Sequence, residues 1–319
     1  MKRNKELNPF KSIVNELGEL EALIKKEEPN KLKTFSRHHV MTLHDVVNLI
    51  TIWDRFTKIR EELFKLDYLQ EMLFRAQKEN KLTEKAEKKL KSLSKKHNIL
   101  TNQLRVDFIS LFLFLDIYLD KLPLLGRVIW GNVQNVEYSS LTDFFDSLKK
   151  EKHNNKQLQS LFHSLNPDMW WIESKLGFYR DKFITHQGSP YQEWFGWGFN
   201  TSEVSIEHIN YDLGNEKHEK RVKDIVEKVK KIFPEIEAME DIRQKVHYLA
   251  ENLYRIEKGA VRAEVVSLIR SIGTVSPNIY SIVSIVIKFS QDYLRYLRHL
   301  TTKEVIPYGL IVTDYNEYP

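Results

Sequence analysis

No cysteine occurs among the 319 residues of this sequence. That absence excludes disulfide scaffolds, thiolate zinc sites, iron–sulfur clusters and cysteine nucleophiles together. It also favours the reducing cytosol as the compartment. Glycine (11) and proline (9) are both scarce for this length. Because the residues that break regular structure are few, helices are favoured over a turn-rich β fold.

Long apolar runs are also missing. The longest, residues 108–119, is interrupted by Asp116 and falls short of the roughly 18 to 20 residues that a membrane span needs. The first ten residues lack the apolar core of a signal peptide. We therefore expect a cytoplasmic protein with no membrane association.

Charge is unevenly distributed, although the net charge is only +5. Residues 78–105 carry nine Lys and Arg against three Glu. Such local basicity is typical of a solvated helix face, and contact with a nucleic acid is the second interpretation.

Apolar residues recur at spacings of three and four along most of the chain, a pattern typical of amphipathic helices. We expect a short helix over residues 10–26 and a long one from an N-cap at Thr42 to about residue 80. Another helix is predicted over residues 83–122, where Pro123 stops it. The second half of that helix is almost entirely apolar, so its end must lie in a core.

Two more helices are predicted over residues 141–165 and 166–186, the latter with Asn166 as its N-cap. With the two long helices they make four helices of bundle length. Alternating apolar residues around 204–209 indicate a short strand or hairpin. Helical patterns then resume over residues 217–232, 236–257, 260–272 and 277–300.

These patterns predict an all-α fold, with a four-helix bundle and an additional C-terminal helical group. We divide the chain into an N-terminal helical extension (1–35), the bundle with an aromatic loop (36–216) and a C-terminal helical region (217–319). A phosphate-binding glycine loop, the HExxH motif, the paired ExxH motif of di-iron bundles and the nucleophile elbow are all missing. We accordingly expect no metal and no cofactor.

The stretch FYRDKFITH, residues 178–186, ends the fourth predicted helix. In it Arg180 is followed by Asp181, and His186 comes after five residues that separate it from the arginine. This arrangement resembles the HEPN superfamily of helical-bundle proteins, which includes many abortive-infection and toxin ribonucleases. Their motif is an arginine, often followed by a polar residue, with a histidine after four to six intervening residues. The resemblance covers roughly residues 36–190.

The resemblance implies metal-independent RNA cleavage, in which the ribose 2′-hydroxyl attacks the adjacent phosphate. His186 would move protons, because imidazole titrates near neutral pH. Arg180 would stabilise the phosphorane charge, and Asp181 would orient one of the two. On a straight helix Arg180 and His186 lie about 120° and about 9 Å apart. The resemblance therefore implies a homodimer in which two motifs face one cleft, in a toxin or defence setting with an antitoxin or regulatory protein as a further partner.

RNA is the expected partner of the basic residues. Lys182 lies within the motif, and the basic helix would guide the strand through Lys88, Lys89, Lys95 and Lys96. The alternative is a catalytically silent helical module that binds a protein or a nucleic acid.

Other candidates have more ordinary interpretations. Four tryptophans, at positions 170, 171, 194 and 197, lie in or just after the motif helix; they favour core or interface packing over base stacking. A second Arg–His pair, Arg37 and His44, is set aside because the predicted cap at Thr42 places Arg37 outside any helix. His247 and Glu251 have helical i, i+4 spacing and are expected to form a solvent-exposed pair.

Overall fold

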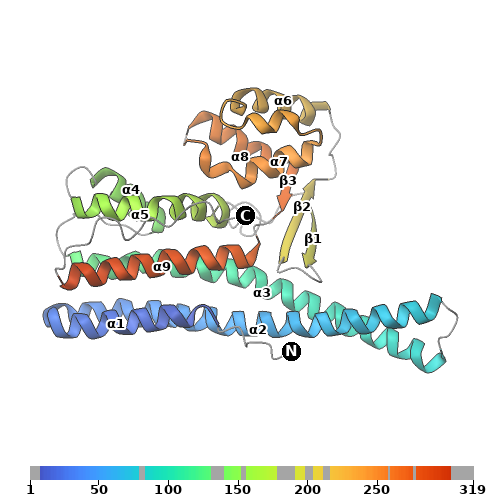
Figure 1. The fold of residues 1–319 in the computed structure, drawn as a ribbon, viewed down its shortest axis with the longest axis horizontal. Coiled ribbons are helices and arrows are strands. Elements are labelled where there is room, and N and C mark those ends of the chain that lie inside the picture. Colours follow the sequence, from blue (N-terminus) through green and yellow to red (C-terminus); the bar gives the residue numbers. More distant parts are fainter. Residues whose placement is uncertain are drawn as a thin grey trace.

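The computed structural model describes residues 8–78, 83–130, 140–151, 156–177, 191–197, 204–210, 216–257, 259–275 and 278–302. Over these ranges the fold is all-α in class, as predicted, with one small three-stranded sheet added (Figure 1). No helix in the described part of the chain is long and apolar enough to cross a membrane.

A long helical hairpin is the largest feature of the molecule. Helices α2 (Leu32–Lys78) and α3 (Glu84–Trp130) each contain 47 residues, which corresponds to roughly 70 Å of helix. They pack side by side and antiparallel, and their connected end projects beyond the other helices (Figure 1). Lys121 Nζ lies 2.6 Å from the buried carboxylate of Asp45. Further along, Arg55 Nε donates to both oxygens of Asp107, at 2.9 and 2.8 Å. These pairs fix the register of the hairpin.

Shorter helices cover one side of the hairpin. Helix α1 (Lys11–Glu27) packs on α2 and on α9 (Ile279–Thr302). Helix α5 (Lys156–Ile172) packs on α9 and on α4 (Leu141–Glu151). Although α9 belongs to the C-terminal region of the sequence, it therefore lies within the same helical assembly as α1 (Figure 1).

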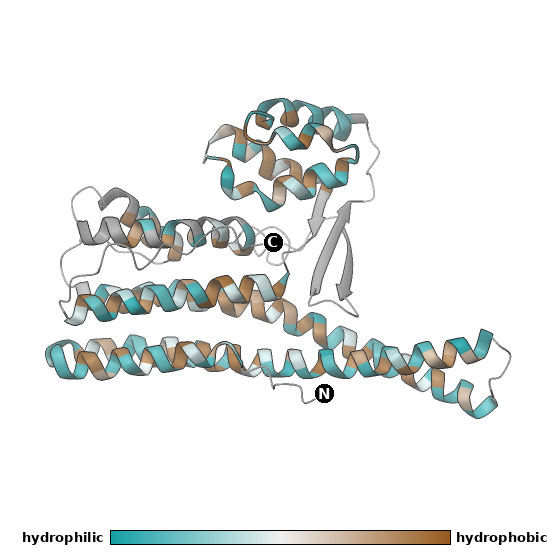
Figure 2. Cartoon of the chain, in the orientation of Figure 1, coloured by the Kyte–Doolittle hydropathy of each residue, from teal (hydrophilic) through white to brown (hydrophobic). Residues whose placement is uncertain are grey.

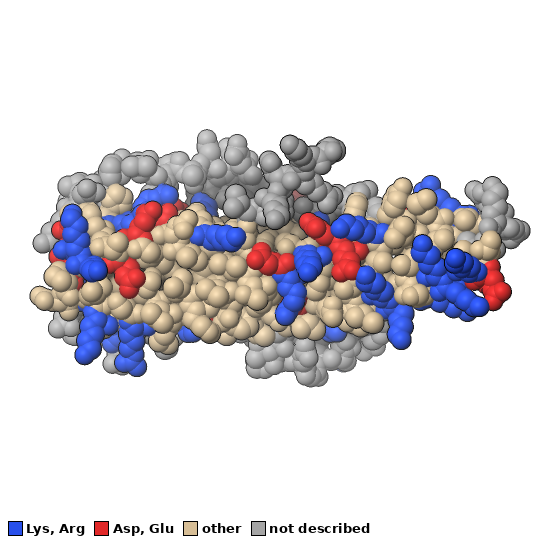
Figure 3. Space-filling view, turned by 90° about the horizontal axis from the view of Figure 1, so that it is seen from below, with Lys and Arg blue, Asp and Glu red and all other residues tan. Residues whose placement is uncertain are grey.

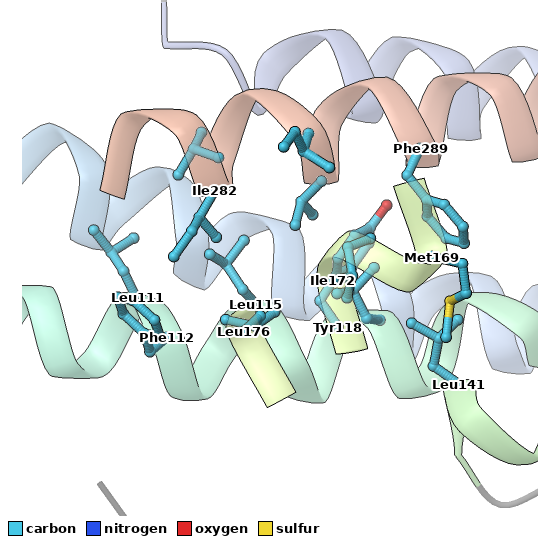
Figure 4. Close-up of a cluster of buried hydrophobic side chains, with 14 of the residues drawn as sticks. Leu111, Phe112, Leu115, Tyr118, Leu141, Met169, Ile172, Leu176, Ile282 and Phe289 are labelled. Atoms are coloured by element: carbon cyan, nitrogen blue, oxygen red, sulfur yellow. The ribbon is translucent and has the colours of Figure 1, made fainter. Parts of the chain in front are cut away.

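The core runs between these helices, and the hydrophobic residues recur along α3 and α9 between hydrophilic ones (Figure 2). The two predicted stripes, Leu111, Leu115 and Leu119 on α3 and Ile282, Val286 and Phe289 on α9, are all buried. Figure 4 shows side chains from α3, α4, α5 and α9 meeting in one cluster.

A second, smaller group of elements packs beside the bundle. The hairpin predicted near residues 204–209 is present: β1 (Tyr191–Trp197) pairs antiparallel with β2 (Val204–Asn210), which pairs with β3 (Gly273–Val275). Helices α6 (Glu216–Val229), α7 (Ile242–Glu251) and α8 (Ala260–Ile272) pack on one another above the sheet (Figure 1). Two 3₁₀ turns flank α7, η5 (Pro234–Ala238) and η6 (Leu253–Arg255).

The predicted N-cap at Thr42 is wrong, because α2 already begins at Leu32, after a 3₁₀ turn η1 (Pro29–Lys31). Thr42 is buried in the helix, and its hydroxyl donates to the carbonyl of His38 at 3.0 Å. The buried stripe extends back to Phe35, so core packing continues the helix through a polar stretch. Arg37 consequently lies inside α2, and the reason for setting aside the pair with His44 does not hold.

The predicted stop at Pro123 is also wrong, because α3 continues to Trp130. A proline inside a helix removes one hydrogen bond and costs about 3 kcal/mol. Leu122, Leu125 and Ile129 are buried around it, and burying such side chains contributes about 1.5 to 3 kcal/mol each. The hydroxyl of Tyr293 on α9 also donates to the Pro123 carbonyl at 3.3 Å.

The expected helices over 141–165 and 166–186 have different boundaries. The first is divided into α4 and α5, and Asn166 lies inside α5 rather than at a cap. Asp168, two residues further on, is buried in contact with α9 through Lys288. Burial against α9 thus carries the helix across the Asn-Pro pair, down to a π-helical turn η3 (Glu173–Gly177).

Candidate functional site

The four motif residues, Arg180, Asp181, Lys182 and His186, lie outside the described residues. The structure describes the chain up to Gly177 and again from Tyr191. The part of the predicted site that can be described is therefore the end of α5, which leads into the motif.

The end of α5 is anchored firmly on both sides. Ile172 and Leu176 are buried in the core, and Leu176 lies beside Leu115 of α3 (Figure 4). Lys288 Nζ of α9 lies 2.9 and 3.1 Å from the two carboxylate oxygens of Asp168. Burial raises the pKa of Asp168, and the hydrogen bond from Lys288 opposes this rise. The π turn that follows is of a kind found frequently at functional sites.

Lys175, in the middle of the π turn, is a buried amine. It is only 9% exposed, and its Nζ makes no hydrogen bond or ion pair among the described residues. Burial lowers the pKa of Lys175 to about 7, while the negative charge of Glu251 acts in the opposite direction. Near neutral pH this lysine is therefore present in both protonation states.

Glu251 and His247 face this turn from α7, which contacts η3. His247 Nε2 lies 3.3 Å from Glu251 Oε1. The hydrogen bond from His247 lowers the pKa of Glu251, and the positive charges of His247 and Lys175 act in the same direction. The predicted i, i+4 pair is thus confirmed as a contact, and both side chains are partly exposed. In addition, His247 Nδ1 is buried without a hydrogen-bond partner in the described part of the chain.

Lys175 gives the end of α5 a group that can exchange a proton near neutral pH. Protonated Lys175 can donate a hydrogen bond to an anionic oxygen, and neutral Lys175 can accept a proton. Perturbed pKa values of this kind cluster at functional sites, although structural ion pairs also produce them. The sequence signal for Lys175 is its spacing of seven from Asp168; Asp168 lies in α5 and Lys175 in η3, and both are buried.

The four predicted RNA-binding lysines of α3 are all exposed. Lys88 pairs with Glu84 at 2.8 Å, and Lys96 pairs with Glu62 of α2. Lys89 and Lys95 make no ion pair among the described residues. Along α3, Lys96 lies about 28 Å and Lys88 about 40 Å from Leu115, the residue beside the π turn. The lysines and the end of α5 therefore cannot contact the same phosphate.

The remaining candidates are placed as follows. Trp171 is half-buried against the core, whereas the side chains of Trp170, Trp194 and Trp197 lie outside the described part. The histidines at positions 38, 39 and 44 all lie on α2. No group of three or more His, Asp or Glu residues that could hold a metal ion is found within the ranges that the structure describes.

No family model, curated protein or solved structure matches this chain.

Proposed function

We propose that this chain is a metal-independent endoribonuclease of the HEPN type, acting in the cytoplasm in a toxin or phage-defence setting. The observation that supports the proposal is the structure of the chain at the end of α5. There the core anchors a π turn that holds a buried lysine with a pKa of about 7. Arg180 follows this turn by three residues in the sequence.

The chemistry needs a proton acceptor, a proton donor and a positive charge. The 2′-oxygen of the ribose forms a bond to phosphorus as its proton leaves, and the bond from phosphorus to the 5′-oxygen breaks as that oxygen gains a proton. The products are a 2′,3′-cyclic phosphate and a 5′-hydroxyl. We assign proton transfer to His186, phosphorane stabilisation to Arg180 and orientation to Asp181.

Exposed lysines support a binding role for RNA. Lys89 and Lys95 are free of ion pairs among the described residues and lie tens of ångströms from the end of α5 along one helix. They would hold the strand at a distance from the cut rather than take part in it, and Lys182 would bind nearer the motif. The active form in this proposal is a homodimer, and a regulatory protein such as an antitoxin is a further partner.

The proposal is tested on a short RNA in excess EDTA. We expect cleavage to products that end in a 2′,3′-cyclic phosphate, and no cleavage of a matched RNA with a 2′-deoxyribose at the cut position. Cleavage of the deoxy substrate, or cleavage only with added divalent metal, would show that the 2′-hydroxyl mechanism is wrong.

A second candidate is the catalytically silent helical module that binds a partner. Exposed apolar side chains along the long hairpin favour it. Under this alternative the wild-type protein has no nuclease activity.

A further inference from the structure

The side of the long hairpin that faces away from the other helices carries an unusual number of apolar residues. On α3 these residues are Ile99, Val106, Leu113 and Ile117, spaced by seven, seven and four. On α2 they are Val40, Met41 and Val47. Each of the seven is between 36% and 61% exposed. We call this set the outer apolar stripe.

The seven residues lie on the sides of α2 and α3 that the other helices leave uncovered. The opposite side of α2 is covered: the Asn8 side chain donates to the Ile50 carbonyl at 3.1 Å, and Trp53 contacts Tyr280 of α9 with ring centroids 5.2 Å apart. The opposite side of α3 holds the core residues Leu111 and Leu115. Seen from below, the side of the molecule on which α1 and α2 lie carries Lys and Arg as well as Asp and Glu, with uncharged surface between them (Figure 3).

The length of the stripe fits one helix. Its α3 part, from Ile99 to Ile117, extends about 27 Å, or five helical turns. Apolar anchors at such spacings are the pattern by which an amphipathic helix is bound in a shallow groove. Several half-exposed apolar side chains on one side of a helix pair are a feature of surfaces that bind another chain.

The ends of the stripe are positively charged. Arg37 and Arg127 lie at one end, and both act on the same neighbour, His38, whose pKa is lowered first by burial and then by these two arginines. Lys95 and Lys58 lie toward the other end. None of these four cations makes an ion pair among the described residues.

This charge pattern decides between possible occupants. A second copy would bring cations of the same sign together at both ends, which is unfavourable. RNA would gain little from the centre, because none of the seven side chains is aromatic and aliphatic side chains provide no stacking surface for bases. Trp and Tyr are the residues enriched at membrane interfaces, and the stripe contains neither. A helix with an apolar stripe and acidic ends matches both features.

We propose that the outer apolar stripe binds an acidic amphipathic helix of a partner protein. This inference does not depend on the ribonuclease activity. The apolar side chains supply the contact area, and the four cations orient the partner through its acidic ends.

The probe is a designed, fluorescein-labelled helical peptide of about 20 residues, with leucine at spacings of three and four and glutamate at both ends. Fluorescence anisotropy with the full chain should give micromolar binding that weakens as salt rises. The double variant Val47→Glu and Val106→Glu should raise the Kd at least tenfold. Met72→Glu, an equally exposed apolar position nearer the hairpin tip, is the matched control and should leave the Kd unchanged.

The charged ends are tested separately. Arg37→Glu with Arg127→Glu should raise the Kd several-fold and flatten the salt dependence, and a peptide with lysine ends should bind more weakly than the glutamate peptide. Equal binding of both peptides, or equal loss in Met72→Glu, would overturn the proposal.

Three further results would overturn the proposal in favour of another occupant. A dimer in sedimentation velocity that Val106→Glu dissociates would indicate a second copy of this chain. Binding to anionic vesicles that Val106→Glu abolishes would indicate a membrane, and displacement of the peptide by a short RNA would indicate RNA. Correct folding of every variant is checked by its thermal unfolding, since the altered side chains are exposed.

Discussion

Replacing Lys175 by methionine should stabilise the protein. The substitution keeps an unbranched side chain of similar length and removes the ammonium group that burial disfavours. No charge is left stranded, because Glu251 is partly exposed and pairs with His247. A gain in stability from removing a native residue would be a direct sign that Lys175 is kept for a reason other than folding.

The expected gain in stability follows from the lowered pKa of Lys175. In the unfolded chain the lysine titrates at about 10.5, and in the folded protein at about 7. At 1.36 kcal/mol per unit, the protonated lysine costs the folded state about 5 kcal/mol below pH 7. Water penetration and structural relaxation around the amine reduce this cost, and we expect it to be about 3 kcal/mol.

The sign of the pH dependence is fixed by the same values. Between pH 7 and 10.5 the unfolded chain binds the proton more than the folded protein does, so wild-type stability rises with pH in that window. Its stability relative to Lys175→Met should increase by about 2 kcal/mol from pH 7 to pH 9. Below pH 7 the difference should be constant.

Urea unfolding of both proteins at pH 6, 7, 8 and 9 measures this difference. Lys91→Met, an exposed lysine of α3, is the matched control and should run parallel to the wild type. Parallel profiles for Lys175→Met and wild type would refute the reasoning, because they would mean that Lys175 stays protonated in the folded protein.

Three more predictions follow from the geometry. Lys89→Glu with Lys95→Glu should weaken RNA binding and reduce the slope of log K against log salt by about 2, as measured by filter binding; an unchanged slope would mean that these lysines do not contact phosphate. Asp168→Ala should destabilise the protein by about 3 kcal/mol, because it leaves the partly buried lysine partner on α9 without its carboxylate; urea unfolding checks this, and a loss under 1 kcal/mol would contradict it. Gly126→Ala should lower the melting temperature by several degrees, because a Cβ there would overlap the Tyr293 hydroxyl and force α9 to move away from α3; an unchanged melting temperature would show that α9 adjusts without cost.

Parts of the fold could be read from the sequence because local signals were sufficient. The first helix was predicted over residues 10–26 and is Lys11–Glu27, and α8 has the predicted bounds. In both cases the apolar pattern starts and stops where the helix begins and ends. The hairpin of β1 and β2 was found from its alternating residues, since period-two patterning is a local property.

The errors have one physical cause. Thr42, Pro123 and Asn166 each carry a local signal for a helix end, yet each lies inside a helix whose neighbours are buried. Tertiary packing contributed more than the local preference, and one sequence does not show which residues will meet.

For the candidate site, the sequence offers only those polar residues that stand at the spacing of a known motif. The Arg–His motif is a pattern of spacing in the sequence. The lowered pKa of Lys175 comes from burial, which Glu251 of α7, some 70 positions away, opposes. No local pattern connects the two. Of the four cations at the outer apolar stripe only Lys95 lies in the basic segment 78–105. Recognising the stripe itself requires knowing which side of the hairpin the other helices cover.

The most direct test of the central claim is the rate of RNA cleavage by the wild type and by His186→Ala, both in excess EDTA. His163→Ala is the matched control, because His163 is an exposed histidine of α5 whose ring contacts Phe162. The account predicts that His186→Ala loses at least a hundredfold in rate while unfolding at the wild-type temperature, and that His163→Ala cleaves like the wild type. Cleavage by His186→Ala at the wild-type rate would contradict the assignment of the site, and a wild type that cleaves no RNA would contradict the function.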